Sequence, residues 1–274
     1  MFACEVKNLS VAYHDRVALH NVSIQVNTGD VMAILGPNGA GKSTLVKAAV
    51  GLIPSLTGNV EFFGEPLDKV RHRVAYMPQA AEIDWDFPAT VRDIVTMGTY
   101  GRLGWLKRPG AREHAAVKES LEAVGISDLA DRQISQLSGG QKQRVFVART
   151  LAQRADLCIL DEPFAGVDVA SEHAITDVLS ALQEAGTTVI IVHHDLSTVR
   201  RFCTASTLLS SGKLIATGPL EESFTQDKLH IAYGLLDEKM MSAHPTQKAT
   251  EKTALHPETE KQEAAPDESA GENK

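Results

Sequence analysis

Two kinds of apolar pattern run along this chain, and together they predict a mixed α/β fold. Val22, Ile24 and Val26 alternate with polar neighbours, which predicts a half-buried strand. Continuous apolar runs at 31–35 and 187–192 predict strands that are buried on both faces, as in a parallel sheet. Elsewhere apolar residues recur at helical spacing, so we expect helices to cover that sheet.

Further elements follow from the same patterns. Apolar residues repeat every three or four positions in 117–124 and 174–182, which predicts two helices. Short apolar segments at 59–63 and 74–77 predict strands, and a Ser-Gly pair within 207–216 predicts a hairpin turn.

The end of the chain has a different composition. From His244 to Lys274 there are four lysines, seven acidic residues and three prolines, and Leu255 is the only large aliphatic side chain. Such a segment buries too little apolar surface to offset the entropy lost on ordering. We therefore expect residues 239–274 to form a disordered acidic tail.

Composition also argues against several classes of protein. The formal net charge of -8 gives no basic surface of the kind that binds nucleic acid. No apolar run reaches the roughly 18 residues needed to span a bilayer, and the N-terminus lacks a basic segment followed by an apolar core. Cys4, Cys158 and Cys203 form no C-x-x-C pair, so neither a disulfide framework nor a zinc site is indicated. We expect a cytosolic protein.

A glycine-rich loop between a predicted strand and a predicted helix carries the first chemical motif. It fits G-x-x-x-x-G-K-[ST], in which backbone N–H groups surround phosphate oxygens at the start of a helix. Lys42 is expected to reach the β- and γ-phosphates, and the Ser43 hydroxyl to bind Mg²⁺. The loop and the threonine after it are Gly36, Pro37, Asn38, Gly39, Ala40, Gly41, Lys42, Ser43 and Thr44.

Two carboxylates follow a second apolar segment at 157–160. Asp161 is expected to hold the magnesium shell, and Glu162 to orient and deprotonate the attacking water. Successive side chains of a strand point to opposite faces, so the two carboxylates are expected to have different roles. Together with the phosphate loop, this pair predicts a nucleoside triphosphatase.

The pentapeptide Leu137-Ser138-Gly139-Gly140-Gln141 lies between these two motifs. It matches the signature motif of the ATP-binding-cassette (ABC) ATPases, and the chain resembles that family over roughly residues 3–235. Ser138 and Gly140 offer a hydroxyl and a backbone N–H beside the N-terminus of the next helix, which is a second anion-binding end. The resemblance implies that Ser138, Gly139, Gly140 and Gln141 cover a nucleotide held by another copy of the chain, in a head-to-tail homodimer.

The resemblance also implies the fold and its divisions. We expect an α/β ABC-ATPase fold over residues 1–238, with a RecA-like phosphate-loop core and an antiparallel β subdomain. A helical signature subdomain is expected at about 89–140.

Four more positions match family elements in the expected order. Tyr13 matches the aromatic residue that stacks on adenine, although a tyrosine of the core is the alternative. Gln79 matches the glutamine that contacts the metal, and Asp168 matches the aspartate that crosses the dimer interface. His194 matches the histidine that bonds the γ-phosphate; His193 is a competitor, but the His-Asp-Leu sequence that follows the strand favours His194.

The segment after Gln79 resembles the branch of the family that imports manganese, zinc or iron(II). Its distinctive residues lie in 84–105 and include Trp85, Phe87 and Trp105, which could line a groove or close a small core. The resemblance implies a peripheral subunit at the cytoplasmic face of a prokaryotic plasma membrane. Its implied partners are membrane permease subunits and, through them, an extracytoplasmic metal-binding protein.

The cargo is not expected to bind this chain. Its ten histidines form no H-x-x-x-H pattern and no Cys/His cluster. ATP and Mg²⁺ are therefore the expected cofactors.

Two alternatives stay open from the sequence. The first keeps the ATPase and changes the cargo to a siderophore, haem or cobalamin. The second is a soluble ABC ATPase that serves as a scaffold for iron-sulfur cluster assembly.

Overall fold

The computed structural model describes residues 1–14, 16–79, 85–103 and 107–234. The residues predicted to form the acidic tail lie outside this range, as do Asp84 and Trp105. Among the described helices, none combines the length and the apolar character needed to cross a membrane.

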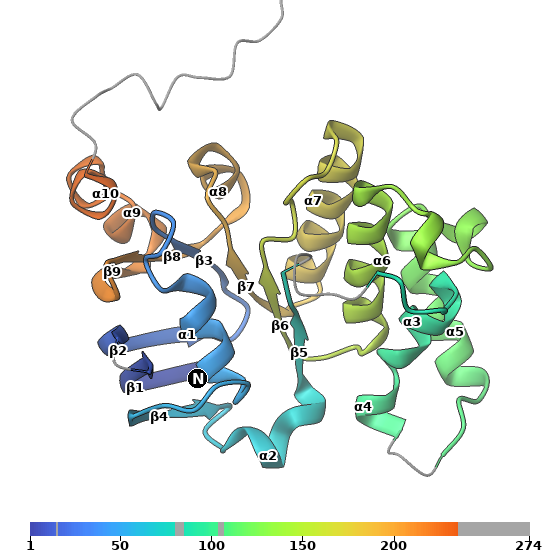
Figure 1. The fold of residues 1–274 in the computed structure, drawn as a ribbon, viewed down its shortest axis with the longest axis horizontal. Coiled ribbons are helices and arrows are strands. Elements are labelled where there is room, and N and C mark those ends of the chain that lie inside the picture. Colours follow the sequence, from blue (N-terminus) through green and yellow to red (C-terminus); the bar gives the residue numbers. More distant parts are fainter. Residues whose placement is uncertain (15, 80–84, 104–106, 235–274) are drawn as a thin grey trace, which may run out of the picture. The chain divides into compact units, whose positions relative to one another are not determined.

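Two sheets form the framework (Figure 1). The first is antiparallel, with strand order β2-β1-β4. The second has six strands in the order β5-β6-β7-β3-β8-β9, all parallel except β9, which pairs antiparallel with β8. The strands are β1 (Phe2–Tyr13), β2 (Arg16–Asn27), β3 (Val31–Leu35), β4 (Thr57–Phe62), β5 (Val74–Met77), β6 (Leu157–Asp161), β7 (Thr188–Val192), β8 (Ala205–Ser210) and β9 (Lys213–Pro219).

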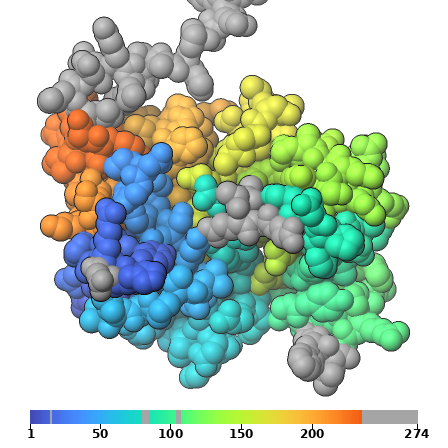
Figure 2. Space-filling model, in the orientation of Figure 1, coloured from blue at the N-terminus to red at the C-terminus, as the bar shows by residue number. Residues whose placement is uncertain are grey.

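Helices connect and cover these strands. Figure 1 shows α3, α5 and α6 grouped on one side of the parallel strands, with β1, β2 and β4 on the other. In the space-filling view the N-terminal strands and the green helical region lie at opposite sides of the face (Figure 2). The helices are α1 (Lys42–Ala49), α2 (Leu67–Val70), α3 (Val91–Met97), α4 (Tyr100–Leu103), α5 (Ala111–Ala123), α6 (Gly139–Ala152), α7 (Val169–Glu184), α8 (Leu196–Phe202), α9 (Leu220–Ser223) and α10 (Gln226–Tyr233).

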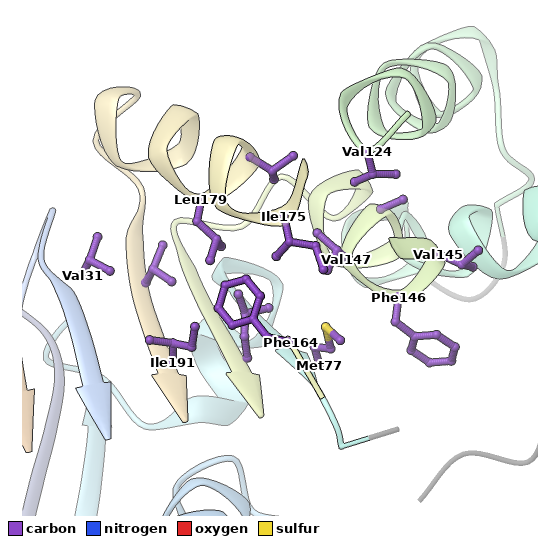
Figure 3. Close-up of a cluster of buried hydrophobic side chains, with 14 of the residues drawn as sticks. Val31, Met77, Val124, Val145, Phe146, Val147, Phe164, Ile175, Leu179 and Ile191 are labelled. Atoms are coloured by element: carbon purple, nitrogen blue, oxygen red, sulfur yellow. The ribbon is translucent and has the colours of Figure 1, made fainter. Parts of the chain in front are cut away.

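The six-stranded sheet separates two hydrophobic cores. Val31, Ala33 and Leu35 of β3 join the core that includes residues of α3, α5, α6 and α7, whereas Met32 and Ile34 join the core that includes β1 and β2. The alternation follows from the two-residue period of a strand. Figure 3 shows part of the first core, where the Phe164 ring lies among side chains from the strands and from the covering helices.

The predicted α/β class and its elements are confirmed, with local differences. The first strand, β1, has no counterpart in the prediction, because β-bulges interrupt its alternation and shift its register against β2. β4 ends one residue early, at Phe62, because Phe63 has a φ of 54°. The helix predicted after the glycine-rich loop is α1, which ends at Ala49.

The two described aromatic residues of the distinctive segment have different environments. The Trp85 ring is partly buried and packs edge-on against Phe146 of α6, with 5.2 Å between ring centroids. Phe87 is 50% exposed. Of the two interpretations, core closure therefore describes Trp85 and an exposed surface describes Phe87.

Candidate functional site

The phosphate loop connects β3 to α1 and is held by its own lysine. Lys42 is the first residue of α1 and is only 6% exposed. Its Nζ donates hydrogen bonds to the carbonyl oxygens of Gly36, at 2.9 Å, and Pro37, at 3.0 Å. Burial lowers the pKa of this ammonium, while the charges of Glu162 and Asp161 oppose that shift. The structure therefore places one buried cation near the two carboxylates at and directly after the end of β6.

The loop's hydroxyl meets the first of those carboxylates. Ser43 Oγ donates a hydrogen bond to Asp161 Oδ1 at 3.1 Å, although the residues are 118 positions apart in sequence. Asp161 is the last residue of β6 and is fully buried. A hydroxyl and a carboxylate are oxygen ligands of the kind that Mg²⁺ prefers.

Glu162 has a different partner from Asp161. Its backbone leaves the strand at a φ of 52°, a region that costs energy for a residue with a side chain. Its N–H donates to the carbonyl oxygen of Val192 at 3.1 Å, and its Oε2 accepts a hydrogen bond from Gln79 Nε2 at 3.0 Å. The two adjacent carboxylates thus bond to separate groups, as predicted, but the left-handed backbone of Glu162 separates them and not the alternation of a strand.

Gln143 joins this site to the signature helix, and sequence reasoning missed it. The side chain is 1% exposed, and its Nε2 donates to the backbone oxygen of Glu162 at 3.1 Å. A buried polar residue in the middle of α6 needs such a partner. The sequence carries no signal for the pairing, because the two residues belong to different elements.

The two adjacent histidines at the end of β7 differ in exposure. His193 is 4% exposed, and neither ring nitrogen has a hydrogen-bond partner within the described part of the chain. Its ring centroid lies 5.0 Å from that of Phe164 and 5.3 Å from that of His194, which is exposed. Burial, followed by the neighbouring His194, lowers the pKa of His193 to about 4, and Asp195 opposes the shift. His193 is therefore a neutral packing residue, and His194 is the accessible one.

The signature residues begin a helix. Ser138 is the N-cap of α6: its Oγ accepts from the Gln141 N–H at 3.3 Å, and Gln141 Oε1 accepts from the Ser138 N–H at 3.0 Å. This reciprocal arrangement is a capping box. Ser138 and Gly139 are exposed, so the start of the helix faces outward. The serine and glutamine predicted to meet a nucleotide are thus engaged in ordering their own helix.

The signature also lies against the loop that follows Glu162. A Cβ at Gly140 would come within 2.9 Å of Ser171 Oγ and 3.6 Å of Asp168 Oδ2, so the close approach requires glycine. Asp168 is the N-cap of α7 and accepts from the Ser171 N–H at 2.7 Å. That backbone bond is the main reason why the pKa of Asp168 is lowered.

Tyr13 stands apart from this network. It is the last residue of β1 and is 45% exposed, so its ring face is accessible. Asn38 and Gly39 of the phosphate loop are also exposed, while Thr44 lies within the first turn of α1.

Fold and site define a phosphate-binding nucleotide hydrolase, and the family follows from comparison with known proteins. The family model described as "ABC transporter" matches residues 19–165. The chain belongs to this family of ATP-binding-cassette proteins. It is an ATP hydrolase whose reaction is coupled to transport.

Individual relatives show which members of the family the chain is similar to. The chain is 50% identical over 233 residues to the zinc transport system ATP-binding protein TroB of Treponema pallidum, covering 85% of this chain and 87% of the relative. It is 49% identical over 234 residues to the manganese transport system ATP-binding protein MntB of Bacillus subtilis, covering 85% and 93%. A solved ATP-binding subunit of an ABC transporter is 25% identical, with a TM-score of 0.72 and coverage of 84% and 98%.

Proposed function

We propose that this chain is the ATP-hydrolysing subunit of an importer for a divalent transition metal: manganese, zinc or iron(II). The observation that carries the proposal is the identity of about one half to proteins named for zinc and manganese transport systems, over nearly their whole length. The proposal assigns the cargo to partner permease subunits and to an extracytoplasmic metal-binding protein. The chain itself would be peripheral, at the cytoplasmic face of the membrane.

In the proposed mechanism the phosphate loop binds ATP, with Lys42 turning from the loop carbonyls to the phosphates. The adenine would stack on the accessible ring of Tyr13. Glu162 would accept the proton of the attacking water, since its carboxylate is oriented by the Gln79 amide. His194 would donate to the γ-phosphate from the end of β7. The assignments to Glu162 and Gln79 rest on their hydrogen bond, and those to Tyr13 and His194 rest on the exposure of their side chains.

Mg²⁺ fits the oxygen groups that lie beside the loop. Ser43 Oγ and Asp161 Oδ1 are 3.1 Å apart, and the amide of Gln79 bonds Glu162 through nitrogen, which leaves its oxygen for a cation. When bound with ATP, Mg²⁺ would neutralise charge on the transferring phosphate.

Coupling to transport would require a second copy of the chain. The exposed start of α6, with Ser138 and Gly139, offers helix N–H groups to an anion outside its own subunit. In the proposed head-to-tail homodimer this surface covers the phosphates held by the partner. Asp168, beside Gly140, would lie at the same interface. ATP favours the closed dimer, and closure shifts the permease between its two states.

The permease is proposed to contact the helical region. Among the residues that the structure describes there, three large apolar side chains are exposed: Phe87 at 50%, Met97 at 39% and Tyr100 at 44%. A cavity of about 220 Å³ lies alongside, with Arg102, Lys107, Arg112 and Arg154 among its lining residues. Exposed apolar side chains with several basic residues and Glu113 nearby would suit an amphipathic cytoplasmic segment that carries acidic residues.

The test is metal uptake in a strain that lacks the gene. Wild type should restore uptake of one divalent metal, Glu162→Gln should fail, and the exposed Glu184→Gln should serve as the matched control that restores it. Restored uptake of a siderophore, haem or cobalamin instead would replace the metal cargo by the first alternative. Normal uptake of every cargo without the gene, together with a defect in iron-sulfur enzymes, would favour the scaffold.

A further inference from the structure

The last described helix reaches back to the first residue of the phosphate loop. The Gly36 N–H donates a hydrogen bond to Tyr233 Oη at 3.1 Å, across 197 positions of sequence. Tyr233 is the final residue of α10, which ends at Gly234 in a left-handed conformation with a φ of 65°. From this geometry we propose that Tyr233 is a positioning residue for the phosphate loop, and that its hydroxyl fixes the Gly36 peptide in the orientation that binds nucleotide phosphates.

Three groups from different elements lie against Gly36. Its N–H meets Tyr233, and its carbonyl oxygen accepts from Lys42 Nζ at 2.9 Å. Gly36 has a φ of 147°, and a Cβ there would lie 2.1 Å from the backbone oxygen of Leu209 in β8. The positive φ and the nearby Leu209 backbone oxygen therefore restrict this position to glycine.

The helix that carries the tyrosine is itself well anchored. Leu229 and Ala232 of α10 are 2% and 1% exposed and belong to the core that also contains Leu208 of β8. The helix contacts both β8 and β9 (Figure 1). The strand that limits Gly36 sterically thus also supports the helix that bonds it.

The tyrosine remains a neutral hydroxyl at physiological pH. Burial raises the pKa of Tyr233, and the Gly36 N–H acts in the opposite direction. A neutral hydroxyl accepts from an amide without adding charge beside the phosphates. Its effect is therefore to restrict the loop, not to attract the nucleotide.

Restriction of the free loop predicts a particular kinetic effect. A loop held in its binding orientation loses less entropy when the nucleotide arrives, so removal of the hydroxyl should weaken binding. A neutral hydrogen bond of ordinary strength corresponds to a change of roughly three- to tenfold in affinity. The hydroxyl of Tyr233 bonds Gly36 and not Glu162, the proposed base. For this reason kcat should change less than KM.

The experiment compares Tyr233→Phe with wild type in the full chain. The dissociation constant for ADP, which is not hydrolysed, is measured by calorimetric titration with Mg²⁺ present, followed by kcat and KM for ATP. We expect the ADP dissociation constant and the KM for ATP to rise together by roughly three- to tenfold, with kcat within about twofold of wild type.

Tyr76→Phe is the matched control, because Tyr76 is also partly buried but lies on β5 and packs in the other core. Its ADP affinity should equal that of wild type, whatever its melting temperature. The proposal is overturned if Tyr233→Phe binds ADP as wild type does, or if both variants lose affinity in parallel with thermal stability. Neither readout involves metal transport, so the outcome is independent of the proposed cargo.

Discussion

The phosphate loop of this chain and the signature segment, which is proposed to cover a partner's phosphates, are built in different ways. The phosphate loop is joined to distant elements: Ser43 bonds Asp161, Gly36 bonds Tyr233, and the neighbouring Glu162 bonds Gln79. The signature is ordered locally, since Ser138 and Gln141 bond each other within three residues. The loop is held by distant parts of its own subunit, whereas Ser138 and Gly139 at the start of α6 are exposed and can face another subunit. If the proposed head-to-tail dimer forms, this difference would explain how one chain carries both halves of a shared site without closing it.

The largest effect is expected from a substitution beside the phosphate loop that removes ATP hydrolysis but keeps ATP binding. Glu162→Gln keeps the shape of the side chain but removes its basicity, so turnover should fall at least a hundredfold. ATP binding should persist, because the lysine and the loop are unchanged. Single-turnover hydrolysis and ATP titration of the purified protein measure the two quantities. Wild-type turnover in this variant would exclude Glu162 as the base, while Glu184→Gln should behave as wild type.

The second prediction concerns a mixture of two variants, each of which is defective in one of the two regions. Lys42→Ala disables the phosphate loop and Ser138→Arg blocks the signature surface with a bulky cation, so each variant alone should be nearly inactive. If the two surfaces meet across a head-to-tail dimer, a mixture contains dimers with one intact site, and ATPase activity should reappear.

Activity of the mixture is compared with the sum of the separate variants at equal total protein. Recovery to a measurable fraction of wild type supports sites shared between subunits. A mixture that stays inactive while a tagged pull-down shows mixed dimers would mean that each subunit works with its own signature.

The third prediction concerns the loss of folding stability in acid that the buried His193 should cause. The pKa of His193 is about 4 in the folded protein, below its ordinary value. As the pH falls, this imidazole therefore binds a proton in the unfolded chain before it does so in the folded chain. The stability from this residue is therefore present above its ordinary pKa and is lost as pH falls from about 6.5 towards 4. Between pH 7 and 5 the loss should be roughly 2 kcal/mol.

His193→Phe removes this titration while keeping an aromatic ring against Phe164. Its free energy of unfolding, measured with urea at both pH values, should fall less than that of wild type. His194→Phe is the comparison, because His194 is exposed. Equal acid sensitivity in wild type and His193→Phe would show that other groups cause the loss.

The smallest effect concerns the connection between the two regions. Gln143→Leu leaves the Glu162 carbonyl without its side-chain donor, which should cost about 1–2 kcal/mol of stability. Turnover should decline several-fold at most, because the carboxylate keeps its bond to Gln79. Urea unfolding and steady-state kinetics test this, with the exposed Gln136→Leu as control. A loss as large as that of Glu162→Gln would give Gln143 a direct part in the chemistry.

Many residues of the candidate site could be predicted from the sequence because they belong to motifs of fixed spacing. The phosphate loop and the Asp161-Glu162 pair combine local residues with a buried strand, so their positions at one sheet edge could be predicted. The left-handed backbone of Glu162 and the partners Gln143 and Tyr233 could not. These contacts join segments 19 and 197 positions apart, and nothing in either segment alone marks the other.

The same limit applies to the fold. Buried parallel strands and helices have strong periodicity, whereas β1 loses its alternation at bulges that depend on pairing with β2 and β4. The distinctive aromatic segment shows the other difficulty, because Trp85 and Phe87 are two positions apart but only the first packs on the core. Burial of an individual aromatic side chain depends on tertiary packing, which no local pattern contains.

The alternation of β3 between the two cores has a mechanical consequence. A strand with no face towards solvent cannot tilt or slide without disturbing both layers at once, since protein interiors are close-packed. The loop that continues from this strand is therefore attached to a strand that is packed on both faces. In a transport cycle β3 and the phosphate loop would therefore keep their position, and the helical region beyond α6 would move.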